Sequence, residues 1–177
     1  MSRIYRSKYE AYPFLCDKSE DLRCDFEILT DETASLTGLL RAMINHKDIQ
    51  EDLLFICELV YHMNPSLRTH TSITPEELAR LEKMTKELEK EVSKKHFVLP
   101  AGSQSAAMSH VLRVKSKALV RLLYRHIHQG HEVNDILVDT ANLLSGYFFM
   151  LALKLNMLDK VEEIEYVSRN YLSGKRS

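Results

Sequence analysis

Residues 97–121 read FVLPAGSQSAAMSHVLRVKSKALVR. Together with the residues that follow them up to 128, they are the most informative part of the chain. A turn containing Pro100 and Gly102 leads to Ser103, a residue type that favours the N-cap position of a helix. No Gly or Pro then occurs before Gly130. This pattern predicts one long helix over residues 103–128.

Four cations on this expected helix lie four residues apart, at Arg113, Lys117, Arg121 and Arg125. That spacing stacks them along one stripe that drifts by about 40° per step. Residues 92–131 contain no Asp or Glu that could offset the repulsion within the stripe, a few tenths of a kcal/mol per pair. The stripe is therefore expected to bind phosphate, for which Arg offers a planar fork and Lys a point charge, or to pair with acidic residues of neighbouring helices or subunits.

The whole chain favours a few long helices, because 177 residues contain only five Gly and four Pro. The clearest helix start is Thr74-Pro75-Glu76-Glu77, which has the pattern of a capping box with Pro at the first helical position. We expect an N-terminal arm over 1–24 and one antiparallel, all-α five-helix bundle over 25–177. Its helices are expected at 25–45, 48–64, 75–95, 103–128 and 134–156, with a short terminal helix at 159–171.

Composition limits the classes of function. The formal net charge is −1, so the chain as a whole has no excess charge for nucleic-acid or membrane binding. The longest apolar stretch, 143–153, is interrupted by Ser and Gly and is short for a bilayer span, and the N-terminus has no apolar signal core. Three cysteines without a CxxC pattern indicate small core residues in a reducing compartment, so a cytoplasmic protein is expected.

Two other groups of residues invite a functional reading. The turn before Ser103 could place an anion at a helix N-terminus, although an ordinary Ser-capped helix explains it as well. His126, His128 and His131 lack the i, i+4 spacing of a metal chelate and suit the negative end of a helix, and His110 is expected to be a hydrogen-bonded interior residue. No metal site is predicted. The apolar positions 147–150 are expected in the core or at a subunit contact.

The stretch 97–121 resembles, without gaps, the signature of the propanediol-utilisation type of ATP:cob(I)alamin adenosyltransferase. Two further segments agree with this family: Thr30-Asp31-Glu32, and 142–147, which reads NLLSGY. Ile4-Tyr5 also agrees with the family's opening residues. The matching positions of the signature are Phe97, Leu99, Pro100, Gly102, Ser103, Ala106, Ala107, His110, Arg113 and Arg121.

The resemblance implies a homotrimer of helical bundles with active sites between subunits, which use ATP, Mg²⁺ and cobalamin. By position, Arg113, Lys117, Arg121 and Asn142 are expected to contact ATP, with Arg121 and Lys117 acting on the leaving triphosphate. Lys117 is also expected to form a salt bridge with Asp31 of the adjacent subunit. Phe97 is expected to cover the lower face of the corrin ring.

The chain also departs from the family pattern. Ala118, Val120 and Ile28 stand where the family has Arg, Glu and Gly, and 8–14, KYEAYPF, replaces its Gly-rich phosphate loop. Tyrosine in place of glycine blocks close approach of a backbone to phosphate. Three readings remain open: an adenosyltransferase, a non-catalytic nucleotide- or corrinoid-binding trimer, and a structural bundle whose basic stripe only joins subunits.

Overall fold

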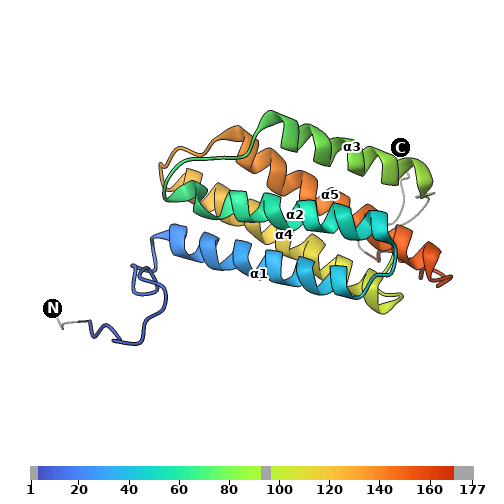
Figure 1. Ribbon diagram of the computed structural model, residues 1–177, viewed down its shortest axis with the longest axis horizontal. Coiled ribbons are helices and arrows are strands. Elements are labelled where there is room, and N and C mark those ends of the chain that lie inside the picture. Colours follow the sequence, from blue (N-terminus) through green and yellow to red (C-terminus); the bar gives the residue numbers. More distant parts are fainter. Residues whose placement is uncertain (1–3, 93–96, 170–177) are drawn as a thin grey trace.

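The computed structural model describes residues 4–92 and 97–169 and is an all-α bundle, as expected. Consecutive helices run in opposite directions along the long axis of the molecule (Figure 1). The elements are α1 (Leu22–Ala42), α2 (Lys47–Met63), the short 3₁₀ helix η1 (Asn64–Leu67), α3 (Pro75–Glu91), α4 (Gln104–His128) and α5 (Asp135–Leu158).

Side-chain caps explain where most of these helices begin. The side chain of Thr74 accepts from the backbone N–H of Glu77 and the Glu77 carboxylate accepts from that of Thr74, so the predicted capping box is confirmed. Ser103 caps α4. Helix α1 begins at Leu22 rather than at the expected residue 25, because Asp21 accepts from the backbone N–H of Arg23.

Helix α5 lies at the centre of the packing, against α4 on one side and α3 on another, while α1 packs on α2 and α4. Tyr147 and Phe148 are among its fully buried side chains and Met150 is also buried, so a core role is confirmed for them. By length and composition the whole of α5, which contains the apolar stretch 143–153, could cross a membrane. The bundle buries 56% of its most apolar window, as is usual for a core helix.

The expected terminal helix over 159–171 is wrong for its described part, 159–169, which forms a turn followed by a non-helical segment; residues 170 and 171 lie outside the described range. Lys160 has a positive φ of 55° immediately after α5, which ends the helix. The chain then pairs with the loop before α4. The backbone N–H of Leu99 donates to the carbonyl of Ile164 at 2.8 Å, and that of Tyr166 donates to the carbonyl of Phe97 at 2.7 Å.

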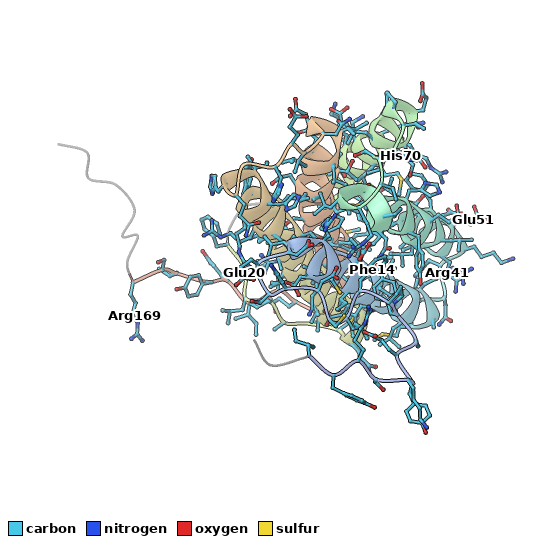
Figure 2. All side chains as sticks on the ribbon, turned by 90° about the vertical axis from the view of Figure 1, so that its left-hand side faces the viewer. Phe14, Glu20, Arg41, Glu51, His70 and Arg169 are labelled. Carbon is cyan, nitrogen blue, oxygen red and sulfur yellow. The ribbon has the colours of Figure 1, made fainter. Side chains whose placement is uncertain are left out.

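The described part of the N-terminal arm contains no helix before Leu22. The arm is nevertheless held against the bundle by Arg68, the residue that follows η1. Arg68 donates to both carboxylate oxygens of Glu27, at 2.7 and 2.9 Å, and to Asp17 at 3.1 Å. Its guanidinium carbon lies 3.5 Å from the centre of the Phe14 ring. Figure 2 shows Phe14 against the bundle and Arg169 on the extended tail that leaves it.

Candidate active site

A cleft of about 310 Å³ collects several of the residues singled out from the sequence. Helix α4 contributes His110, Arg113 and Lys117. Helix α5 contributes Ser145, Gly146 and Phe149, and the loop before α4 contributes Phe97 and Val98. The α5 residues and the tail that supports the loop were not predicted as site residues, because their approach to α4 depends on tertiary packing that no local pattern encodes.

Phe97 stands at the edge of this cleft with 77% of its surface exposed. Large aromatic side chains are usually buried, and an exposed one beside a cleft is available to a ligand or a partner. Its backbone is nevertheless fixed, because its carbonyl accepts from the N–H of Tyr166. The ring is therefore presented on an anchored segment.

The cationic stripe divides into two parts. Arg113 is half-buried in the cleft, with its guanidinium carbon 6.0 Å from the centre of the Phe149 ring, and Lys117 lines the cleft while remaining exposed. Arg121 and Arg125 are exposed on later turns and do not line it. Within residues 4–92 and 97–169, no ion pair joins any of these four cations to an acidic side chain.

This result bears on one prediction for the stripe, that acidic residues of neighbouring helices in the same chain pair with it. The neighbouring acidic residue on α1, Glu32, pairs with Lys115 at 2.5 Å, and Lys115 lies off the stripe. Acidic groups of the same chain therefore leave the stripe's charge uncompensated in the described part of the molecule. Phosphate binding and pairing with another subunit stay as the two predictions for the stripe.

The start of α4 is closed by groups of the chain itself. Ser103 accepts from the N–H of Ala106 at 3.3 Å, and its own N–H donates to Asn156 at 3.0 Å. The hydroxyl of Ser105 donates to Asp159 at 3.1 Å. With a carboxylate already placed at this helix start, the geometry favours an ordinary Ser-capped helix over an anion site.

Asp31 and Asn142 lie away from the Phe97 cleft. Asp31 accepts from the hydroxyl of Tyr61 at 2.9 Å, which raises the pKa of that tyrosine, and it lines a separate hollow of about 450 Å³ between the arm, α1 and α2. Asn142 is exposed on α5 and donates to the carbonyl of Val138. One chain therefore places Lys117 and Asp31 on different hollows.

The arm includes residues 8–14, which the resemblance aligns with the family's Gly-rich loop, and it borders the Asp31 hollow. Tyr12 and Leu15 from the arm line the same hollow as Asp31, together with Ile28 on α1. Burial, followed by the hydrogen bond to Glu27, raises the pKa of Tyr12 to about 12. The arm therefore presents aromatic and aliphatic side chains to this hollow.

The histidines behave differently from one another. His126 is buried and its ring stacks on that of His131 at 4.2 Å, near the C-terminal end of α4, which suits a structural role. His110 is also buried, at 3% exposure, but neither ring nitrogen has a hydrogen-bond partner within the described structure. The expectation of a hydrogen-bonded interior His110 is therefore wrong.

Metal binding by the protein's own side chains finds no support in the described ranges. They contain no group of three or more His, Cys, Asp or Glu side chains placed to hold an ion. The three cysteines are free thiols, of which Cys24 is buried.

Comparison with known proteins places this geometry in a family. The chain is 26% identical to the corrinoid adenosyltransferase of Bacillus subtilis (strain 168) over 157 residues, covering 83% of this chain and 81% of that protein. Its fold matches two variants of a PduO-type adenosyltransferase from Lactobacillus reuteri. One, complexed with cobalamin and ATP, has TM-score 0.75 and 23% identity, covering 84% of this chain and 87% of that one.

The other, complexed with ATP, has TM-score 0.74 and 24% identity, with coverages of 83% and 88%. The family model described as cobalamin adenosyltransferase matches residues 18–155, which include α1 to α4 and nearly all of α5. The chain therefore belongs to the cobalamin adenosyltransferase family.

Proposed function

We propose that this protein transfers the 5′-deoxyadenosyl group of ATP to the cobalt of reduced cobalamin. The electron pair of Co(I) attacks the 5′ carbon of ATP, a cobalt–carbon bond forms, and the bond from that carbon to oxygen breaks. Triphosphate leaves with the bonding pair. The reaction needs a site that removes the axial base from cobalt, orients the two substrates and stabilises the charge of the leaving group.

One observation carries the proposal: the anchored, exposed ring of Phe97 adjoins the uncompensated cations of α4 in a chain of this family. An aromatic ring under the corrin covers the lower face of cobalt and excludes water or an axial base from it. Cations beside it suit the triphosphate end of ATP. Removal of the axial base and stabilisation of the leaving group thus meet at one cleft, between the loop that carries Phe97 and α4.

The leaving triphosphate is assigned to the cations of α4. Arg113 and Arg121 supply planar donor pairs for phosphate oxygens, and Lys117 supplies a compact charge. Arg121 and Lys117 act in the reaction by stabilising the charge that develops on triphosphate. Asn142 contacts the nucleotide, and Mg²⁺ enters with the phosphates of ATP rather than in a protein cage.

The variants of the Lactobacillus reuteri enzyme support the assignment of Lys117. A phenylalanine is replaced in one and an arginine is replaced by lysine in the other, and those positions are twenty residues apart, the same separation as Phe97 and Lys117. The variant with lysine is complexed with ATP. A lysine at this position is therefore compatible with bound ATP in a protein of the same fold.

The assembly proposed is a homotrimer in the cytoplasm. Lys117 is exposed and has no acidic partner within the described residues, and Asp31 is exposed on another hollow, so a contact between copies brings the two together. Such a contact completes a site whose corrinoid side comes from one copy and whose nucleotide side is shared.

A second candidate is a non-catalytic trimer that binds nucleotide or corrinoid. The conformation of the arm favours it: Phe14 stacks on Arg68, and Tyr12 lines the hollow where a Gly-rich loop would bind phosphate. Loss of that loop removes backbone donors without changing the fold.

An anaerobic assay separates the two candidates. Purified protein is mixed with chemically reduced cobalamin, ATP and Mg²⁺, and the adenosylated product is followed by its absorbance while triphosphate is quantified. Transfer predicts both products in equal amounts, with a large loss of rate in Arg121→Ala and little change in Arg125→Ala, an exposed cation one turn along the same helix. No product at saturating substrates, with both ligands bound, favours the binding protein.

A further inference from the structure

Three buried polar atoms without hydrogen-bond partners in the described structure belong to two residues that line one cleft. They are both ring nitrogens of His110 and the Nε of Arg113. A buried polar group without a hydrogen-bond partner destabilises the fold, so three of them at one place need an explanation. The simplest explanation is that a polar group of a ligand occupies the cleft during function and bonds to these atoms.

Helix geometry brings the two residues together. They lie three positions apart on α4, hence on the same face. The Phe149 ring lies beside both, with its centre 6.1 Å from that of the His110 ring and 6.0 Å from the Arg113 guanidinium carbon. Burial, and then the charge of Arg113, lower the pKa of His110, so the imidazole is neutral at physiological pH.

The donors and acceptors define the ligand. A neutral imidazole presents one N–H donor and one acceptor nitrogen, and the Nε of Arg113 presents a donor. A phosphate or carboxylate has only acceptors and leaves the imidazole acceptor unmatched. A primary carboxamide offers an oxygen that accepts two hydrogen bonds and an N–H that donates one.

We propose that His110, together with the Nε of Arg113, binds a primary carboxamide on a side arm of the corrinoid, next to the Phe97 ring, while the Nη groups of Arg113 bind the triphosphate. The inference rests on the proposed function, because the corrin periphery carries such amides. It assigns His110 as a positioning residue that holds the corrin over Phe97. It also predicts selectivity, since a corrinoid with a carboxylate on that arm offers no donor to the imidazole.

The test measures binding, so it does not depend on turnover. Cob(II)alamin is titrated into ATP-saturated protein and followed by absorbance and electron paramagnetic resonance. His110→Leu is expected to bind cob(II)alamin about 3- to 10-fold more weakly, the effect of one lost neutral hydrogen bond, with the Kd for ATP unchanged. His110→Asn, which keeps a donor and an acceptor, is expected to recover part of the affinity. The matched control is His126→Leu, a buried histidine on the same helix outside this cleft.

Monocarboxylic derivatives of cobalamin, each with one carboxamide replaced by carboxylate, then identify the arm. For one derivative, wild type should already bind weakly and His110→Leu should add no further loss. If His110→Leu weakened the binding of every derivative equally, the inference would be overturned, because the cleft would then hold only an ordered water. Equal affinity of His110→Leu and wild type would overturn it while leaving adenosyl transfer intact. Absence of cob(II)alamin binding by wild type would overturn both.

Discussion

Gly102 gives the sharpest prediction about how the loop carrying Phe97 is held. It has a φ of +131°, and a Cβ atom at this position would lie 2.0 Å from the Oδ1 of Asn156. In Gly102→Ala, backbone strain costs about 1–3 kcal/mol. Displacing Asn156 also breaks its bonds to the N–H of Ser103 and the carbonyl of Ala101, at about 0.5–1.5 kcal/mol each. The expected loss of stability is about 2–6 kcal/mol.

Urea unfolding at one fixed protein concentration measures this loss. Gly38→Ala is the matched control, because its Cβ would meet nothing within 4 Å inside α1, and it should stabilise by about 0.5–1 kcal/mol. In an Asn156→Ala background, Gly102→Ala should cost only its strain component, so the two changes are not additive. An unchanged midpoint for Gly102→Ala, or full additivity with Asn156→Ala, would refute this reasoning.

Three other predictions concern the site, the assembly and the arm. Phe97→Ala should change the free energy of unfolding by less than about 0.5 kcal/mol, because the ring is exposed. The same change should greatly slow adenosyl transfer. A large drop in stability would instead show that the ring has a structural role. Lys117→Glu should repel Asp31 of the adjacent copy and shift the trimer towards monomers, which light scattering measures. The control Lys90→Glu, on α3, should leave the trimer intact. An intact Lys117→Glu trimer would count against the salt bridge. The pKa of Tyr12 is raised to about 12, so the contribution of its neutral hydroxyl to stability is present below pH about 10 and is lost as pH rises through 12. Tyr12→Phe should reduce this loss of unfolding free energy at high pH. Identical pH profiles of unfolding free energy for the variant and wild type would contradict this role of Tyr12.

Local patterns in the sequence were sufficient for most of the bundle. Thr74 and Ser103 mark helix starts because capping is a contact between residues three apart, and the order of long helices follows from the scarcity of Gly and Pro. The extended tail was missed because its backbone pairs with Phe97 and Leu99, far away in the sequence. A pairing partner at that separation leaves no periodic signal.

The candidate site was predictable only in part, for the same reason. Phe97, Arg113 and Lys117 share one cleft, but spacing on a helix could not show that Arg121 lies beyond its edge or that Asn142 and Asp31 lie elsewhere. The role of His110 depends on what α5 places opposite it, and a helical pattern does not show whether a buried histidine finds a partner.

The most direct test is a crystal structure of the protein with ATP, Mg²⁺ and cob(II)alamin. We expect triphosphate oxygens within hydrogen-bond distance of Arg113 and Arg121, at a junction between two copies, with the Phe97 ring under the corrin. Triphosphate bound away from α4, or a corrin that does not contact Phe97, would contradict this expectation.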